Sequence, residues 1–414
     1  MSNETIIDIA GSSPQWSDLE DWVRIKVQGF IQDILEEEVT EFLGRGKSER
    51  RELADARSGY RNGYGRERKL TLGCGTIGLR RPRIRDSDEH FESRVLPLFA
   101  KSSPKIKELI PELYLHGLSE GDFDLALRGL LGDDAPLSAS TVARLKEKWH
   151  DEFVEWGNRS LGHLEVVYVW VDGVYVKAGF EKEKSAVLVV LGALSDGKKV
   201  VLAISSGYRE STEGWAEVLR SLKSRGMNCP KLVMGDGNLG IWGALANVYP
   251  EASEQRCWNH KMVNVLDRLP KKEQSEAKDL LRSVVYAQSR TQAEKSRDVF
   301  IQWCTSRGYA SAADTLERDW ERMVTFYDFP KEHWKHLRTT NPIESPFAYL
   351  RLRTDAAKRF KKVDNAIAVI WKLLLVGEKK FRILTASNMC KDVYYGVKFK
   401  DGVRISTQAE EVAA

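Results

Sequence analysis

The sequence predicts a mixed α/β protein in which helical and small β-rich modules precede an α/β core. Residues 166–173, VVYVWVDG, form a nearly unbroken β-branched and aromatic run that is typical of a buried central strand. Further strand-like runs follow it, then a helical pattern and another strand, which is the order of a mixed sheet. Before this core, residues 18–43 carry apolar side chains at helical spacing.

Composition and charge narrow the class of protein. No apolar run in the 414 residues approaches the ~20 residues that span a bilayer, so we expect no membrane partner. The five cysteines form no close pairs, which argues against a disulfide framework and fits a reducing compartment. The net charge is only +4, but basic residues outnumber acids between Arg45 and Arg85 and again from Arg351 to Lys362. Segregated basic segments of this kind predict a nucleic-acid partner.

The N-terminal helix is expected to end at Gly44, and its apolar stripe must pack on another module or on a second subunit. From Gly59 onward, apolar and basic residues alternate along the sequence, and Asn62-Gly63 and Gly73–Gly75 are turn signals. This pattern predicts a small β-rich element, or alternatively a solvated basic loop. Its outward side chains, interleaved with Tyr60 and Tyr64, favour contact with a phosphate backbone. The basic residues of this element are Arg66, Arg68, Lys69, Arg80, Arg81, Arg83 and Arg85.

Residues 105–117 are helical in pattern, and two short helical patterns follow, at 119–132 and from Ser138 or Ser140 through Trp149. Two short helices joined by a tight polar turn resemble a helix-turn-helix. Helical pairs without DNA-binding roles look the same, but the basic context favours DNA binding, with Arg144 as a contact residue.

Four strand-like runs begin the core, and a helix from Ser211 to Arg225 follows them. The runs are Glu165–Asp172, Val174–Phe180, Ser185–Leu194 and Lys199–Ser206. Asp172-Gly173 and Asp196-Gly197 are expected to be tight turns. A fifth strand, Lys231–Met234, leads into a second acid in the string LVMGDGN, Asp236. Both acids therefore fall at the ends of buried strands in one sheet.

The rest of the chain is predicted to be mostly helical. A helix near 241–249 and a short strand near 254–257 are followed by a helical block from 270 to 328. A further helix is expected to start near Glu344, with Ser345 as its cap and Pro346 in its first turn. A last helix begins beyond Val363, and the tail after Asp401 is expected to be loose.

Three acids stand out: Asp172, Asp236 and Glu344. Taken alone, Asp172 could simply open a turn. Carboxylates are also the ligands of Mg²⁺, and two such ions roughly 4 Å apart can activate a water or a 3′-hydroxyl and stabilise the leaving oxygen of a phosphodiester. We expect two Mg²⁺ ions, with Mn²⁺ as an alternative. Spacing in the sequence does not by itself bring the three acids together.

The strings VYVWVDG, LVMGDGN, QRCWNHKMVNVLDRLPK and HLRTTNPIES, in this order, closely resemble the Mutator-like transposases of bacterial insertion sequences. The resemblance covers roughly residues 40–385. It implies a ribonuclease H-like core with a DDE triad on Asp172, Asp236 and Glu344. It also implies that the helical block from about Val263 to Asp328 is an insertion before the Glu-bearing helix.

The family's C-x-x-H signature falls on Cys257 and His260. Our preferred interpretation is that His260 is catalytic and reaches the scissile phosphate or an attacking group, with Cys257 packed beneath it. A buried Cys with a hydrogen-bonded His is the structural alternative. Zinc, with His333 and His336 as the second ligand pair, is the less favoured one. Trp258 is either a stacking platform for an unpaired base or a core residue.

On the Glu344 helix, Arg351 and Lys358 return to nearly the same face, with Arg353 and Arg359 beside them. This pattern predicts a phosphate-binding stripe, or alternatively a solvated basic face. Before the helix, residues 338–341 are candidates to bind substrate or orient Glu344. These residues are Arg338, Thr339, Thr340 and Asn341. Pro346 departs from the small polar residue usual in the family, which leaves the local geometry open.

We therefore expect a transposase, at least dimeric, that binds terminal inverted repeats, cuts DNA with metal ions and joins the freed 3′-hydroxyl to another phosphodiester. A DNA-binding protein without catalysis and a nuclease without joining activity are the alternatives. We expect a cytoplasmic, nucleoid-associated bacterial protein. Its expected segments are an N-terminal helical module (1–58), a basic β-rich element (59–100), a helix-turn-helix-like module (101–160), two parts of the core (161–262 and 331–362) around a helical insertion (263–330), and a C-terminal helix and tail (363–414).

Overall fold

The computed structural model describes residues 15–50, 57–97, 100–115, 131, 139–177, 185–207, 211–237, 239–356, 360 and 363–405. It divides into two compact units, Met1–Leu145 and Lys146–Ala414. Each unit is described by itself below.

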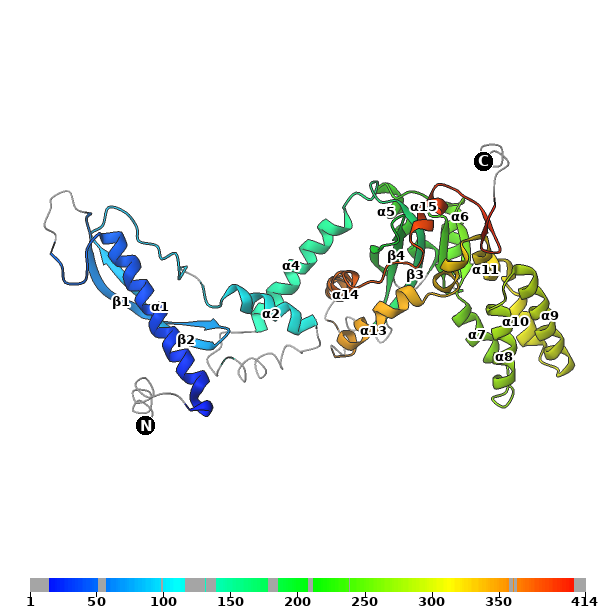
Figure 1. Cartoon of the computed structure of the whole chain (residues 1–414), viewed down its shortest axis with the longest axis horizontal. Helices are drawn as coiled ribbons and strands as arrows, with labels where there is room; N and C mark the ends of the chain where they lie inside the picture. The colour runs from blue at the N-terminus through cyan, green and yellow to red at the C-terminus, as the bar shows by residue number, and fades with distance from the viewer. Residues whose placement is uncertain are drawn as a thin grey trace. The chain divides into compact units, whose positions relative to one another are not determined.

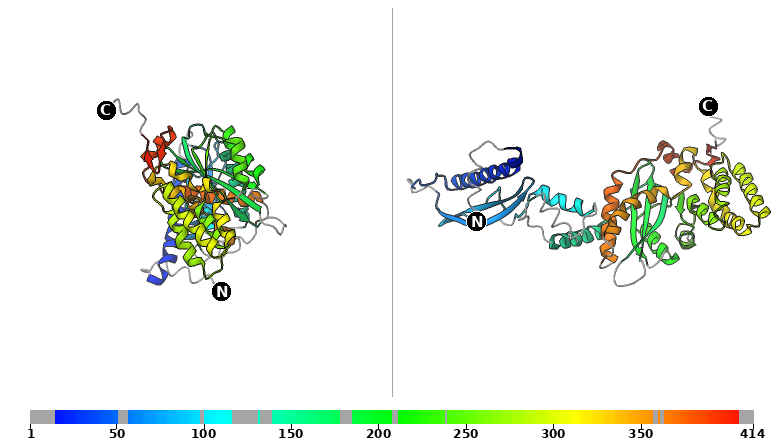
Figure 2. Two further views of the ribbon diagram at one scale, coloured as in Figure 1. Left: turned by 90° about the vertical axis from the view of Figure 1, so that its right-hand side faces the viewer. Right: turned by 90° about the horizontal axis from the view of Figure 1, so that it is seen from below.

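In the first unit, a long helix lies along one face of a two-stranded hairpin (Figures 1 and 2). The helix is α1 (Leu19–Leu43), preceded by the 3-10 turn η1 (Trp16–Asp18), and the strands are β1 (Tyr60–Leu72) and β2 (Gly75–Arg85). The small core between them contains Leu35, Leu70, Ile77, Leu79 and Leu96. The predicted α1 stripe therefore packs on another module of the same chain, and the helix ends at Gly44 as predicted, with a φ of 65°.

The hairpin confirms one predicted turn and corrects the other. Leu72 pairs with Gly75, so the chain reverses at the Gly73–Gly75 signal. Asn62-Gly63, predicted to be a turn, lies inside β1, where the register shifts between Arg61 and Tyr64. Gly63 has a φ of 62°, and a glycine in this conformation absorbs one extra residue as a β-bulge without ending the strand.

Two further helices are α2 (Pro104–Leu115) and α4 (Ala139–Gly157). α4 matches the second helix of the predicted helix-turn-helix but continues well past Trp149. The first helix of that pair, 119–132, lies outside the described residues except for position 131, so the motif stays a prediction.

The second unit is built on a mixed five-stranded sheet with the order β5-β4-β3-β6-β7. Its strands are β3 (Val166–Val176), β4 (Ser185–Leu194), β5 (Lys199–Gly207), β6 (Leu232–Gly235) and β7 (Ser253–Arg256). β4 runs antiparallel to β3 and β5, whereas β6 is parallel to both β3 and β7. The predicted mixed α/β class is confirmed.

The expected turn at Asp172-Gly173 is wrong, because both residues lie within β3. Asp172 pairs with Val189 on β4, and Gly173 pairs with Leu188. The runs predicted as two strands are one continuous strand as far as Val176. Pairing with β4 along the whole of this segment outweighs the local turn preference of Asp-Gly. The turn at Asp196-Gly197 is confirmed by a φ of 80° at Gly197.

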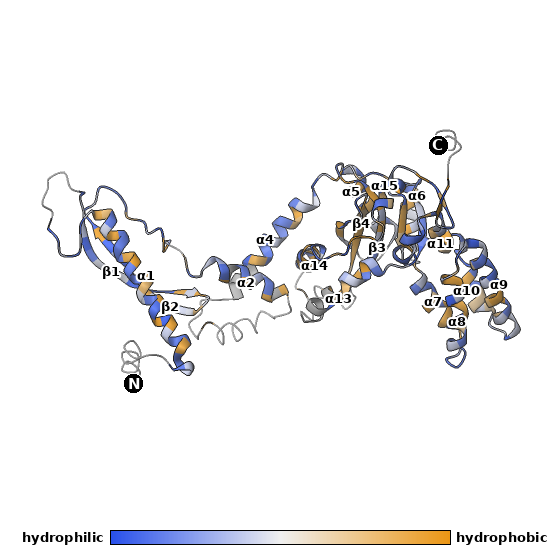
Figure 3. Ribbon diagram, in the orientation of Figure 1, coloured by the Kyte–Doolittle hydropathy of each residue, from blue (hydrophilic) through white to orange (hydrophobic). Residues whose placement is uncertain are grey.

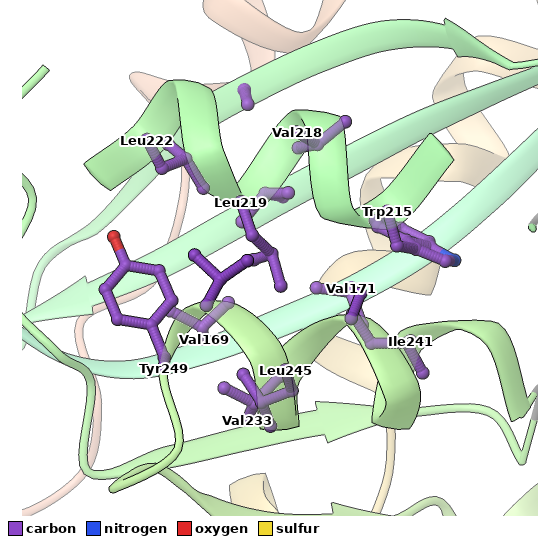
Figure 4. Packing of buried hydrophobic residues seen from close by; sticks show 14 of the residues in the cluster. Val169, Val171, Trp215, Val218, Leu219, Leu222, Val233, Ile241, Leu245 and Tyr249 are labelled. Atoms are coloured by element: carbon purple, nitrogen blue, oxygen red, sulfur yellow. The ribbon is translucent and has the colours of Figure 1, made fainter. Parts of the chain in front are cut away.

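Helices α5 (Thr212–Ser224) and α6 (Leu239–Val248) cover one face of this sheet. Val169 and Val171 of β3 and Val233 of β6 interdigitate there with Leu219 and Leu245 of the two helices (Figure 4). The hydrophobic colour along β3 and β4 in Figure 3 shows why the sheet must be covered on both faces. α14 packs against β5, and α13 and α15 pack against β3.

After β7 the chain is helical up to the C-terminal hairpin, which confirms the predicted helical block. The elements are α7 (Trp258–Leu266), α8 (Gln274–Val285), α9 (Arg290–Ser306), α10 (Ala310–Glu317), α11 (Trp320–Val324), η2 (Thr325–Asp328), η3 (Lys331–His333), α12 (Trp334–Leu337), α13 (Asn341–Ala356), α14 (Val363–Glu378) and α15 (Asn388–Tyr394). No helix in the described ranges combines the length and apolar character needed to cross a membrane.

Two details of this region differ from the prediction. Residues 402–405 of the tail are held in place, because β8 (Phe399–Lys400) and β9 (Val403–Arg404) pair and Gly402 N donates to the Tyr327 carbonyl at 3.1 Å, and residues 406–414 lie outside the described residues. The Glu-bearing helix α13 starts at Asn341, so Pro342 takes the first turn and Pro346 lies inside the helix. Ser345 is therefore not its cap.

Candidate active site

Asp172 lies on β3, and Asp236 directly follows β6, the parallel neighbour of β3. β3 and β6 pair in register up to Trp170 and Met234, and each acid lies two residues further along its strand direction. The Trp170 indole donates to the His336 carbonyl at 3.0 Å, on the face opposite Val169 and its apolar cluster. Because side chains alternate along a strand, Asp172 follows Trp170 onto this face, and continuing the register of β6 past Met234 puts Asp236 on it as well.

Glu344 lies in the first turn of α13 and is oriented by Thr340. The buried Thr340 hydroxyl donates to Glu344 Oε1, and its oxygen lies 3.2 Å from Cys257 Sγ. Because a hydroxyl has one proton, donation to the carboxylate leaves the Thr340 oxygen as an acceptor for the thiol. The expectation that residues before this helix orient Glu344 is thus met by Thr340.

His260 lies between two of the acids. Its Nδ1 atom is 3.6 Å from Asp236 Oδ1 and 3.9 Å from Glu344 Oε1. The start of α7 is held in place by the backbone, since Cys257 N donates to the Gly235 carbonyl at 2.9 Å and Trp258 N to the Arg338 carbonyl at 2.8 Å. The end of β6, the start of α7 and the approach to α13 therefore meet at one point.

The surroundings of His260 favour its charged form. The close Cys257 sulfur raises the pKa most, burial opposes the charge, and Asp236 and Glu344 add attraction, which together bring the pKa to about 9. The buried Nδ1 makes no well-aligned hydrogen bond within the described part of the chain, so the attraction of Asp236 and Glu344 for His260 is electrostatic. These neighbours therefore favour the protonated form of His260.

The donor atoms around His260 form two chemically different sets. Ligand atoms of Cys257, His260 and Glu344 all lie within 4.8 Å of one another. Asp172 lies within β3 rather than at the strand end predicted for it, whereas Asp236 directly follows β6. Their carboxylates and that of Glu344 on α13 are the hard oxygen ligands that Mg²⁺ and Mn²⁺ prefer, whereas Cys257 and His260 are softer donors. The register of β3 with β6 and the sheet face of Asp172 assign its carboxylate to the same set of oxygen ligands.

His333 and His336, the second ligand pair of the zinc alternative, do not lie with Cys257 and His260. His333 is fully buried, with Nδ1 2.8 Å from the Tyr168 hydroxyl and Nε2 3.1 Å from the Ala386 carbonyl. His336 lies beside Thr385. Among the described residues, neither histidine belongs to the group formed by Cys257 and His260.

Protonation of His336 should weaken the fold in acid. Its pKa is lowered from 6.5 to about 4, first by burial and then by nearby Lys199 and Lys335. The unfolded chain then binds this proton before the folded chain does, so the free energy of unfolding falls as pH drops through that window. We expect His336→Gln to show a smaller loss between pH 7 and pH 5 in urea denaturation. The exposed His163→Gln should behave like wild type, and an unchanged His336→Gln profile would contradict the assignment.

Three other predicted site residues have clear positions. Trp258 is buried and donates through Nε1 to the Met323 carbonyl at 2.8 Å, so it is a core residue rather than a stacking platform. Arg338 is half-buried, with its guanidinium 5.1–5.6 Å from the ring centres of Tyr286, Phe326 and Trp334. Asn341 accepts from Asn259 Nδ2 at 2.9 Å, which joins α13 to α7.

The basic residues predicted to contact DNA are spread over several elements. On the hairpin, Arg66, Lys69, Arg80 and Arg83 are exposed, whereas Arg68 and Arg81 are half-buried. Arg144 on α4 and Arg351 on α13 are exposed. Arg353 belongs to α13 by its backbone, and its side chain is outside the described part. Lys358 and Arg359 lie outside the described residues.

The sequence reasoning missed Asn259, Arg256 and Asp319. Asn259 lies inside the C-x-x-H string, which was the available signal. Arg256 immediately precedes that string, but its partner Asp319 lies 63 residues away, and no local pattern connects the two.

Comparison with known proteins agrees with these observations. The sequence model described as "Transposase, Mutator family" matches residues 4–381. The chain is 42% identical over 297 residues, 72% of its length and 92% of the relative, to the transposase for insertion sequence element IS6120 of Mycolicibacterium smegmatis. It is 40% identical over 280 residues, 67% of its length and 94% of the relative, to that for IST2 of Acidithiobacillus ferrooxidans.

A solved structure titled "Drosophila P element transposase strand transfer complex" covers 68% of this chain and 83% of its own, at 13% identity and a TM-score of 0.29, which is too low to establish a common fold. The family match and the two sequence relatives, in contrast, are extensive. The chain belongs to the Mutator family of transposases.

Proposed function

We propose that this transposase binds the terminal inverted repeats of its own mobile element, cleaves DNA strands with divalent metal ions and transfers the freed 3′-hydroxyl to a target phosphodiester. The observation that carries the proposal is the position of His260, within 4 Å of both Asp236 and Glu344. Two acids distant in sequence converge there, on the sheet face that Asp172 also occupies by register.

In the proposed reaction, Asp172, Asp236 and Glu344 form a DDE triad that holds two Mg²⁺ ions, with Mn²⁺ as a substitute. When bound, the ions supply Lewis acidity that activates the attacking oxygen and stabilises the leaving oxygen. Thr340 holds Glu344 in the orientation needed for ligation. His260 faces the scissile phosphate and would donate a hydrogen bond to the developing negative charge.

The remaining parts take supporting roles in this proposal. The five-stranded mixed sheet, with α5 between β5 and β6, supports a ribonuclease H-like core, and residues 263–330, from the end of α7 through η2, form the insertion before α13. The exposed basic residues of the β1–β2 hairpin, with the 101–160 module, bind the element ends. Because two ends must be brought together, we propose at least a dimer.

The test is a strand-transfer assay with purified protein and DNA that carries the ends flanking its reading frame. We expect joined product with Mg²⁺ or Mn²⁺ and none in EDTA. Nicked DNA without joined product, whatever target is supplied, would instead identify a hydrolytic nuclease. Specific DNA binding with no cleavage in either metal would identify a regulator that does not cut.

Thr340→Val should separate orientation of Glu344 from folding. Valine has nearly the shape of threonine but cannot donate to the carboxylate, so we expect cleavage to fall about 10- to 100-fold. Thr340→Ser, which keeps the hydroxyl, should retain most activity. Equal cleavage rates for the valine variant and wild type would show that the hydrogen bond is dispensable.

A further inference from the structure

A bend in the helical insertion carries an acid that reaches back toward the active site. Asp319 joins α10 to α11 and has a left-handed φ of 62°, which is uncommon outside glycine and tolerated best by Asn and Asp. Its Oδ2 accepts from Arg256 Nη1 at 2.8 Å, and its Oδ1 from Arg322 Nη1 at 3.2 Å. Arg322 in turn pairs with Glu254 on β7. Asp319 is therefore shared by two arginines.

Arg256 connects this bend to the second acid. It ends β7, is only 9% exposed, and its guanidinium lies so close to Gly237 that a Cβ atom there would approach it to 2.1 Å. Gly237 N donates to Asp236 Oδ1 at 2.9 Å. The guanidinium thus supports the turn that fixes the Asp236 carboxylate.

A second tether reaches the same bend from the other side of the C-x-x-H string. Lys261 follows His260 on α7, is 1% exposed, and donates through Nζ to the Arg318 carbonyl. The residues on either side of Cys257–His260 are therefore both anchored to residues 318–319.

We propose that Asp319 is a positioning residue for the metal-binding acids: through Arg256 it holds the Asp236-Gly237 turn at the distance from His260 that ion binding requires. This inference rests on the proposed function, because Asp236 is a metal ligand only there. A carboxylate that partners a buried arginine supports its position strongly, since removing it leaves an uncompensated charge. In this proposal, contacts made by the helical insertion help to determine the affinity of the active site for metal ions.

The matched pair of variants is Asp319→Asn and Glu273→Gln. Asn keeps the shape and tolerates the left-handed backbone, so the change removes the charge and one of the two oxygen acceptors without removing the side chain. Glu273 pairs with Arg307 at 2.7 Å elsewhere in the insertion and is 17% exposed, against 18% for Asp319. Both changes remove one carboxylate of equal burial from the same region, and only Asp319 touches Arg256.

Two measurements are compared. We expect Asp319→Asn to raise the Mg²⁺ concentration for half-maximal DNA cleavage about 10-fold and to speed hydrogen exchange at residues 233–237. Glu273→Gln should change neither. Gly237→Ala, which displaces Arg256 from the other side, should shift the Mg²⁺ requirement in the same direction. Wild-type values for Asp319→Asn in both measurements, or equal changes in Glu273→Gln, would overturn the proposal.

The two proposals fail in different ways. If the wild-type protein cuts no DNA with any divalent ion, the proposed function fails, and hydrogen exchange at residues 233–237 still decides whether Asp319 holds this turn. If wild type cuts and Asp319→Asn behaves like Glu273→Gln, the proposed function stands and Asp319 is only a structural residue.

Discussion

Replacing Asp172, Asp236 or Glu344 with its amide is expected to abolish strand cleavage, lowering it at least about a thousandfold. An amide keeps the size of the side chain but removes the charge that ligates a hard cation. Loss of a metal that contributes several kcal/mol to the transition state corresponds to several factors of ten in rate. Cleavage of labelled end DNA in Mg²⁺ measures the effect, and gel shifts should show that end binding persists.

The control for this prediction is Asp196→Asn, which removes an acid from the β4–β5 turn and should cut like wild type. Asp172→Asn is the sharpest of the three substitutions, because strand register and face alone place this residue in the site. Wild-type cleavage by Asp172→Asn would remove it from the triad and leave Asp236 and Glu344 as the metal ligands.

Trp258→Ala is expected to lower the free energy of unfolding by about 3–5 kcal/mol. The indole is 1% exposed, packs edge-to-face on Trp320 and donates to the Met323 carbonyl, so truncation creates a cavity and removes one of the two hydrogen bonds to that carbonyl, the other coming from Gln255 Nε2. Urea denaturation followed by circular dichroism measures the loss. Trp16→Ala, at a residue 89% exposed, is the matched control and should cost almost nothing.

This second prediction also decides between the two roles considered for Trp258. A core residue lowers stability when truncated, whereas a base-stacking residue lowers DNA affinity in a protein of unchanged stability. Wild-type stability with weakened DNA binding in Trp258→Ala would restore the stacking role.

The strands and helices were largely predictable because their signals are local. The β-branched run of β3 and the helical periodicity of α1 each fall within one window of sequence, and both elements are confirmed. The errors arose where distant pairing overrides a local preference. Gly173 is held in β3 by β4, and the hairpin beyond Asp401 is held by Tyr327.

The site was predictable only in part, for the same reason. The acids in or next to apolar strand runs could be recognised from the sequence, but bringing Asp236 and Glu344 to His260 requires the packing of α13 and α7 near the sheet. The family resemblance predicted that these acids come together, whereas their spacing in the sequence did not. Arg256 and Asp319 had neither a motif nor a local pattern, so only the three-dimensional contacts reveal them.

The order in which the site residues occur along the chain has a consequence for synthesis on the ribosome. Thr340 and Glu344 are translated after the entire helical insertion, whereas the basic hairpin and Asp172 and Asp236 come earlier. A polypeptide that stops within the insertion would carry the proposed DNA-binding elements and two acids but would lack the third. If the N-terminal elements bind element ends as proposed, such truncated products would lack Glu344 and could not complete the metal site. Premature termination would then yield competitors of the full-length transposase.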